Sequence, residues 1–255
     1  MCALFERDNP IFDDEIPLRD GYEPDNLQAR EEELEKYRRA LMPIIRGAPP
    51  RNIFLHGEPG VGKTAATKYI LNHLQKDAQK HDDLDIHVVY LSCNGYNSSY
   101  KVTIGIINKI RELTGRKNEQ IPTTGYAKPD VHNMMFDEIR KLGGTVLFVL
   151  DEIDNIGDDQ DILYELPRAH SSDRLEMDEA QPGIIGISND PGFLNNLDPA
   201  VEDTLMEEVI RFSVYNASEL ESILRPRAEI AFQDGVLEQD VVPLCAALTA
   251  QETGS

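Results

Sequence analysis

The segment Gly57–Thr64 holds residue types spaced for phosphate chemistry, because it matches the pattern GxxxxGK[ST] in full. Its glycines let the backbone curl so that successive N–H groups point at phosphate oxygens. Lys63 can reach the β- and γ-phosphates, and the Thr64 hydroxyl can ligate Mg²⁺. An apolar run before the loop and a helical pattern after it disfavour a plain glycine turn. We therefore expect a site for ATP or ADP made of Gly57, Gly60, Val61, Gly62, Lys63, Thr64 and Ala65.

Two adjacent carboxylates, Asp151 and Glu152, follow the apolar run 146–150. Sheets of the α/β class bind ligands at the carboxyl ends of their strands, which is where these two side chains would lie. Asp151 is expected to hold Mg²⁺, through water, and Glu152 to orient or deprotonate the attacking water. The alternative is a solvated acidic strand end. A position about ninety residues after the phosphate loop favours the hydrolytic interpretation.

Four further aspartates follow this pair. They do not fit the calcium-loop pattern, in which Ile153 would occupy the third position. We interpret them as a solvated acidic loop: Asp154, Asp158, Asp159 and Asp161.

Asn189 comes directly after the apolar segment 183–188. A polar residue at the tip of a buried strand between the two motifs could hydrogen-bond the γ-phosphate or the lytic water, so we assign Asn189 a catalytic role beside Glu152. The alternative is that Asn189 only starts the turn 189–192.

A local cluster of basic residues lies in the segment 100–117, where five bases face a single acid, Glu112. The resulting local charge of +4 could contact a phosphate backbone. A charged run on a helix can also be only its solvated face, and both interpretations stay open. The candidate DNA-contacting residues are Lys101, Lys109, Arg111, Arg116 and Lys117.

Alternating apolar runs and helical patterns would position these motifs. Five runs predict strands, at 52–56, 86–93, 145–150, 183–188 and 209–214. Helices are predicted before and between these runs, at 29–45, from the phosphate loop to 80, and at 100–113, 131–142 and 161–169. Beyond 215 only helices are expected, at 218–232 and 239–250, the first with a capping box formed by Ser218 and Glu221.

This alternation predicts the α/β fold class, with a three-layer P-loop sheet of about five parallel strands followed by a partial α-helical lid. We expect three regions in the chain. They are an N-terminal arm at 1–28, a nucleotide-binding domain at 29–215 and a truncated helical lid at 216–255.

The composition of the 255-residue chain is strongly acidic, with 46 acids against 25 bases and a net charge of −21. Such a surface repels itself and nucleic acid in dilute buffer, whereas molar salt shortens the Debye length to about 3 Å. We therefore expect a protein adapted to a salty cytoplasm; an acidic partner-binding surface is the weaker alternative, because the acids are spread along the whole chain.

Several classes of protein are disfavoured by the sequence. No apolar run reaches the roughly 18–20 residues that span a bilayer, and the N-terminus lacks a signal-peptide core, so a cytoplasmic protein without membrane contact is expected. Cys2, Cys93 and Cys245 are too scattered for a disulfide framework or a zinc site, and the six histidines show no metal-binding spacing.

The chain resembles the archaeal origin-recognition and cell-division-cycle initiator proteins of the AAA+ class. The resemblance is carried by the loop GEPGVGKT, the strand end VLDEID, the strand tip ISND and the later stretch LDPAVEDTL…VIRFSVYNASELESIL…RAEIAF. It runs from about Arg7 to the last residues. The later stretch is the specific part, since a P-loop alone identifies only a superfamily.

The resemblance implies a DNA replication initiator that binds origins, holds ATP between an α/β domain and a helical lid, and helps to load the replicative helicase. By resemblance, Tyr215 and Arg227 would line the adenine and phosphate sides of the nucleotide pocket. The basic segment 100–117 overlaps the family's helical insertion that contacts DNA.

Two departures from the family pattern bear on catalysis. The family usually has an arginine where this chain has Ala200, and that arginine would act on a neighbouring subunit's ATP. In the family, a second ATP-sensing arginine, more lid and a winged-helix domain follow the point where this sequence stops at Ser255. We therefore expect ATP and Mg²⁺ binding with slow or partner-dependent hydrolysis, and leave open whether the chain is an enzyme.

The sequence is compatible with three functions. The first is an initiator that acts with other initiator subunits or the helicase. The second is a nucleotide-gated regulatory or scaffold protein that does not bind DNA, and the third is a decayed paralogue.

Overall fold

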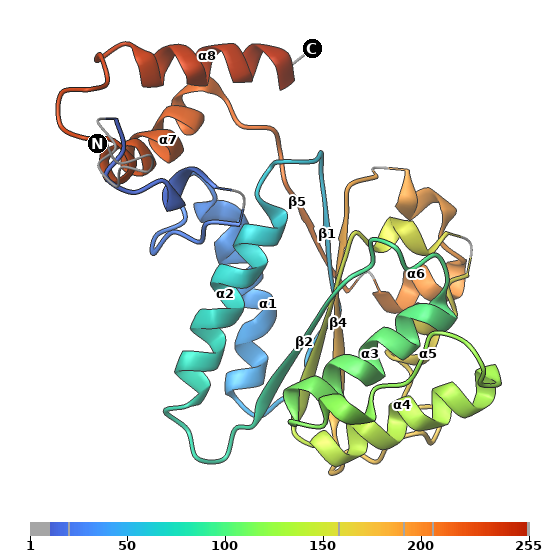
Figure 1. Ribbon diagram of the computed structural model, residues 1–255. Helices are drawn as coiled ribbons and strands as arrows, with labels where there is room; N and C mark the ends of the chain where they lie inside the picture. The colour runs from blue at the N-terminus through green and yellow to red at the C-terminus, as the bar shows by residue number, and fades with distance from the viewer. Residues whose placement is uncertain (1–10, 20, 158, 191, 206, 254–255) are drawn as a thin grey trace, which may run out of the picture. The chain divides into compact units, whose positions relative to one another are not determined.

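The computed structural model describes residues 11–19, 21–157, 159–190, 192–205 and 207–253 (Figure 1). The chain divides into two compact units. One unit is Glu32–Phe212, and the other combines the described residues up to Glu31 with those from Ser213 onward. Cys2, Asp158 and the first ten residues of the expected arm lie outside the described residues.

A parallel sheet of five strands forms the centre of the unit Glu32–Phe212, in the order β2-β3-β4-β1-β5. The prediction of five parallel strands is confirmed. Because every pair is parallel, the carboxyl ends of the strands meet at one edge of the sheet. The strands are β1 Ile53–His56, β2 Ile86–Ser92, β3 Thr145–Asp151, β4 Gln181–Ser188 and β5 Glu208–Arg211.

Helices cover both faces of this sheet, with α1 and α2 on one face and the helices from α3 to α6 on the other (Figure 1). The three-layer arrangement predicted from the sequence is therefore confirmed. The helices of this unit are α1 Glu31–Ile45, α2 Lys63–Ala78, α3 Ser99–Leu113, α4 Lys128–Leu142, α5 Asp161–Glu165 and α6 Pro199–Leu205, with short 3₁₀ turns at Lys117–Glu119, Ile153–Ile156 and Phe193–Asn196.

Strands β3 and β4 are buried in the core of this unit. Every residue of β3 from Val146 to Asp151 and of β4 from Gly183 to Ser188 is buried. Continuous burial is the expected pattern for parallel strands that helices cover on both faces. The sheet is consequently a fixed frame for the polar side chains at its carboxyl edge.

The second unit is helical and contains α7 Ala217–Ala231, α8 Val241–Thr253 and the 3₁₀ turn η1 Ile16–Leu18. The described part of the expected N-terminal arm packs on the end of α7. Phe12 forms an antiparallel bridge with Phe232, and their ring centroids are 4.8 Å apart. The backbone N–H of Asp13 also donates to the carbonyl of Ala231 at 2.9 Å.

Two expectations about helix ends were wrong. Helix α7 is capped by Asn216, whose side chain accepts from the N–H of Glu219, and not by Ser218. The pair Asn216 and Glu219 lies two residues before the pair Ser218 and Glu221, and the helix begins at the earlier of these two capping boxes. Helix α5 ends at Glu165, because Pro167 has no N–H with which to continue the helix.

Within the described residues, no helix combines the length and the apolar character needed to cross a membrane.

Candidate nucleotide-binding site

The phosphate loop connects β1 to α2, and its glycines are required by its backbone. Gly57 has φ +154°, and a Cβ added there would lie 2.4 Å from the carbonyl oxygen of Phe212. Gly60 has φ +81°, and Gly62, the N-cap of α2, has φ +88°. These conformations are strained for residues with a Cβ. The loop is therefore held in a curled form at the N-terminus of α2, where an anion is favoured.

Lys63 is the first residue of α2 and is buried within the loop. Its Nζ donates to the carbonyl oxygens of Gly57 at 2.8 Å and Glu58 at 2.7 Å. Burial lowers the pKa of Lys63, while the carboxylates of Asp151 and Asp154 act in the opposite direction. The side chain thus places an amine donor inside the loop, where phosphate oxygens can replace the two carbonyls as its acceptors.

Val61 and Ala65 complete the predicted loop residues. Val61 is buried, and Ala65 is partly buried in the first turn of α2. Their backbone N–H groups belong to the segment whose donors point at a phosphate in loops of this type.

Thr64 and Asp151, the two residues that the sequence assigns to Mg²⁺, lie together at the carboxyl edge of the sheet; binding of the ion stays a prediction. The Thr64 hydroxyl donates to Oδ2 of Asp151 at 2.8 Å, and the N–H of Glu152 donates to Oδ1 at 3.0 Å. A third donor reaches the same carboxylate, because the Tyr90 hydroxyl also donates to Oδ2. Burial and this hydrogen bond raise the pKa of Tyr90. The Asp151 carboxylate is 7% exposed, so it depends on these donors.

These oxygen donors fit Mg²⁺. That ion is bound by one or two carboxylate or hydroxyl groups and completes its shell with water and phosphate oxygens. Among the described residues, no group of three or more His, Cys, Asp or Glu side chains gathers as an all-protein metal site. A threonine hydroxyl and one carboxylate beside a phosphate loop are therefore suited to a nucleotide-bound Mg²⁺.

Glu152 follows Asp151 with an unusual backbone, φ +57° and ψ +44°. A residue with a Cβ in the left-handed region stores strain, which is frequent at functional sites. Its carboxylate accepts a hydrogen bond from Ser92 Oγ at 3.3 Å, and Ser92 pairs with Asp151 in the register of β2 and β3. The side chain is thus directed along the carboxyl edge of the sheet.

Asp154 corrects the expectation of a solvated acidic loop. It is half-buried, and its Oδ1 accepts from the Ser188 hydroxyl at 2.8 Å and from the N–H of Asn189 at 3.0 Å. One carboxylate therefore ties the end of β3 to the end of β4 and fixes the position of Asn189. Asp159 and Asp161 instead form ion pairs with Lys128.

Sequence reasoning missed Tyr90, Ser92 and Asp154 as residues of the site. Tyr90 and Ser92 have i, i+2 spacing on a strand, which puts both side chains on one face of the sheet. This i, i+2 spacing is visible in the sequence, but the sequence does not indicate that the side chains on this face reach Asp151. Asp154 was hidden among the other aspartates, because only the fold brings Ser188 to it.

The two residues assigned to the nucleotide by resemblance, Tyr215 and Arg227, belong to the second unit. The guanidinium of Arg30 lies 3.7 Å from the centre of the Tyr215 ring and donates to the Ser213 carbonyl at 2.7 Å. The guanidinium of Arg227 lies 5.3 Å from the centre of the Tyr22 ring. Their contact with a nucleotide stays a prediction.

The basic segment is less free than its local charge suggests. Arg111 and Arg116 both pair with Glu138, a carboxylate that is 1% exposed on α4. Burial alone would raise the pKa of Glu138, but hydrogen bonds from Arg116, Lys141 and Arg111 outweigh it and lower the pKa to about 2. The two arginines therefore attach α3 and the following turn to α4.

The three lysines of this segment have weaker ties. Lys109 and Lys117 lie 2.9 Å and 3.7 Å from Glu112, and Lys101 donates to Asn97 Oδ1 at 2.9 Å. DNA contact by these residues stays a prediction.

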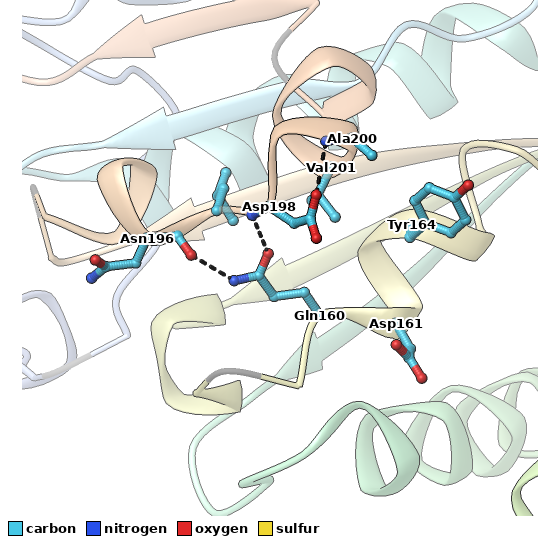
Figure 2. A pocket seen from close by; sticks show the side chains of 8 residues that line it. Gln160, Asp161, Tyr164, Asn196, Asp198, Ala200 and Val201 are labelled. Carbon is cyan, nitrogen blue, oxygen red and sulfur yellow. Dashed lines mark hydrogen bonds between the residues drawn. The ribbon is translucent and has the colours of Figure 1, made fainter.

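Ala200 lies in α6 and lines an open pocket of about 650 Å³ (Figure 2). Gln160 joins the two sides of this pocket: its amide Nε2 donates to the Asn196 carbonyl, and its Oε1 accepts from the N–H of Asp198, both at 2.8 Å. Among the residues that line this pocket, no arginine or lysine is present. The remaining lining residues are Asp161, Tyr164, Leu197 and Val201.

Comparison with known families identifies two matching regions. The AAA ATPase domain model matches residues 26–177, and the Cdc6 AAA+ ATPase-type lid domain model matches residues 221–255.

Similar proteins with curated descriptions include archaeal ones. ORC1-type DNA replication protein 11 of Haloarcula marismortui is 49% identical over 252 residues, which are 99% of this chain and 59% of that protein. ORC1-type DNA replication protein 10 of Halobacterium salinarum is 46% identical, over 98% of this chain and 59% of that protein. The chain therefore spans about 60% of the length of these relatives.

Among solved structures, the Aeropyrum pernix ORC1 protein in complex with DNA has a similar fold. The TM-score is 0.81 at 34% sequence identity, with coverage of 96% of this chain and 61% of that one.

Proposed function

We propose that the chain is an ATP- and Mg²⁺-binding replication initiator module. The premise is that it belongs to the AAA ATPase family and, within it, to the archaeal ORC1-type DNA replication proteins. The observation that carries the proposal is the juxtaposition of a complete phosphate loop with Asp151, to which the Thr64 hydroxyl donates at 2.8 Å. A loop of this kind without an adjacent carboxylate would lack the second Mg²⁺-binding group.

Each loop residue has a separate task in the proposed binding step. The curled backbone at Gly57 and Gly62 presents N–H groups to the phosphates, and Lys63 exchanges its two carbonyl acceptors for phosphate oxygens. A bound Mg²⁺ would neutralise phosphate charge and be held by the Thr64 hydroxyl and, through water, by Asp151. Tyr215 and Arg227 are proposed to contact the adenine and phosphate groups, on the family resemblance alone.

Hydrolysis is proposed to be slow or to depend on a partner. Glu152 would orient or deprotonate the attacking water, and Asn189 would hydrogen-bond that water or the γ-phosphate. Ala200 has no cationic side chain, and an arginine that acts on a neighbour's nucleotide can accelerate phosphoryl transfer by roughly 10³–10⁵. The chain would thus hold nucleotide more effectively than it cleaves it.

Origin DNA and other initiator subunits or the replicative helicase are the proposed partners. The relatives carry the name of DNA replication proteins, and the Aeropyrum pernix structure contains DNA. Such a function would act in the cytoplasm, where an archaeal chromosome lies. For the basic segment we propose DNA contact through Lys101, Lys109 and Lys117, with Arg111 and Arg116 acting mainly as structural residues.

A regulatory protein that binds nucleotide but not DNA is the second candidate. Two observations favour it: Glu138 already occupies both arginines of the basic segment, and the net charge is −21. Filter binding of duplex DNA in molar KCl separates the two candidates. An initiator should retain the duplex and lose most of this binding in a Lys101→Ala, Lys109→Ala, Lys117→Ala variant. Equal, negligible retention by both forms favours the regulatory protein.

Titration with a fluorescent ATP analogue in molar KCl and Mg²⁺ tests the nucleotide site. Lys63→Ala should weaken binding at least tenfold, because one charge-assisted hydrogen bond to phosphate contributes about 1.5–3 kcal/mol. Lys76→Ala is the matched control, since Lys76 is an exposed lysine on the same helix. Unchanged affinity of the Lys63→Ala variant would contradict the assigned pocket.

A further inference from the structure

We propose that Tyr90 is a positioning residue that sets the Mg²⁺ dependence of nucleotide binding by holding the carboxylate of Asp151 through its hydroxyl. The inference rests on the proposed ATP-binding function and adds a residue to it that lies outside both sequence motifs.

The strand register explains how Tyr90 reaches this carboxylate. In the pairing of β2 with β3, Ser92 lies opposite Asp151 and Tyr90 lies opposite Val149. Residues two apart on a strand share a face, so the Tyr90 side chain is on the same face as Ser92. Its hydroxyl donates to Oδ2 of Asp151. A shorter side chain at position 90 would not span the distance of two residues along the strand.

The three donors to Asp151 differ in what Mg²⁺ binding would do to them. The N–H of Glu152 is part of the backbone and binds Oδ1. The Thr64 hydroxyl binds Oδ2, but its oxygen is also the proposed ligand of the metal. Only the Tyr90 hydroxyl is a side-chain donor with no other task at the site. It therefore keeps the carboxylate oriented while Thr64 turns its oxygen to the ion.

The ring of Tyr90 faces a lysine of α2. Lys68 follows Thr64 by one helical turn, and its Nζ lies 5.9 Å from the centre of the Tyr90 ring. Tyr90 therefore lies beside the helix that carries Thr64, and its hydroxyl donates to the residue at the end of the strand that carries Asp151. Tyr90→Phe keeps the ring and removes only the hydroxyl, which isolates the proposed effect.

The test is a titration of nucleotide affinity against Mg²⁺, with a fluorescent ATP analogue in molar KCl, starting from a chelated, Mg²⁺-free sample. Tyr90→Phe should raise the Mg²⁺ concentration at half-maximal enhancement by about tenfold, the factor expected for one hydrogen bond to a charged group. Affinity without Mg²⁺ should stay at the wild-type value. Tyr100→Phe is the matched control, because the Tyr100 hydroxyl donates to the Tyr126 carbonyl at 3.0 Å, away from the site.

A double variant tests whether Tyr90 acts through the carboxylate. In an Asp151→Ala background, which removes the acceptor, adding Tyr90→Phe should leave the Mg²⁺ dependence unchanged, whereas a residue with a merely structural role would cause the same loss in both backgrounds. An unchanged or lowered Mg²⁺ midpoint in the single variant overturns the inference while ATP binding by the wild type stands. Failure of the wild type to bind ATP overturns the proposed function and, with it, this inference.

Discussion

The Oγ1 atom of Thr64 lies 2.8 Å from Oδ2 of Asp151, although the two residues are 87 positions apart in the chain. The contact exists because β1 and β3 both point their carboxyl ends to the same edge of the sheet, with β4 between them. A hydroxyl and a carboxylate in hydrogen-bond contact are preorganised for a cation, since small rearrangements allow both to face it. The fold therefore brings the two side chains that we propose as Mg²⁺-binding groups into direct hydrogen-bond contact.

Asp154→Ala should reduce ATP hydrolysis, where turnover is measurable, with little effect on ATP affinity. The substitution removes the acceptor that fixes Asn189 and leaves the fully buried Ser188 hydroxyl with a longer contact to Asp190. Loss of a hydrogen bond to a buried group should also lower the free energy of unfolding by about 1–3 kcal/mol. Phosphate release and chemical denaturation measure the two effects.

Asp82→Ala is the control for this substitution, because Asp82 is exposed and lies in the turn before β2, at the opposite end of that strand from Ser92. If the Asp154→Ala variant has the stability and the turnover of the wild type, the role assigned to Asp154 in the site is wrong.

Gly57→Ala should abolish nucleotide binding and destabilise the protein. A Cβ at this position would lie 2.4 Å from the Phe212 carbonyl oxygen, so the loop or the end of β5 must shift. Gly115→Ala is a matched control, because Gly115 also has a positive φ, +75°, but no atom lies within 4 Å of an added Cβ. The Gly115→Ala control should lower the free energy of unfolding only by the backbone strain of one residue, about 1 kcal/mol. Equal melting temperatures for the two variants would mean that the close approach to Phe212 has no consequence.

Much of the fold could be predicted from the sequence, because its strands are apolar runs and its phosphate loop is a contiguous pattern. The segment 145–150 predicts β3 to within one residue, since a strand covered on both faces must be apolar throughout. The start of α7 was misplaced because Asn216 and Ser218 begin two overlapping capping patterns, and local sequence does not decide between them.

The candidate site was predictable only where its residues belong to a contiguous sequence motif. Lys63, Thr64 and Asp151 follow from motifs, whereas the role of Asp154 depends on a partner, Ser188, that belongs to another strand. The surroundings of the basic segment could not be predicted for the same reason. Glu138 neutralises two of its arginines from a separate helix, and a count over residues 100–117 does not include it.

Thermal stability should rise strongly with KCl concentration between dilute buffer and molar salt. At a net charge of −21, repulsion among surface carboxylates opposes the compact state, and the shorter Debye length in molar salt screens it. Melting curves over a KCl series measure this effect, and a series in which sucrose replaces the salt controls for preferential exclusion. A melting temperature that does not change with KCl would contradict the interpretation of this chain as a salt-adapted protein.

Glu138→Gln should destabilise the protein by about 2 kcal/mol near neutral pH, because it leaves Arg111 and Arg116 without the charge they surround. The pKa of Glu138 in the fold is about 2, below its ordinary 4.5, so its stabilising contribution is complete above pH 4.5 and is lost as the pH falls toward 2. The difference in melting temperature between wild type and variant should therefore be constant above that pH and shrink below it. Glu119→Gln, which alters an exposed partner of Arg116, is the control and should show a much smaller difference at every pH. A gap between wild type and the Glu138→Gln variant that widens in acid would contradict the ionised state assigned to Glu138.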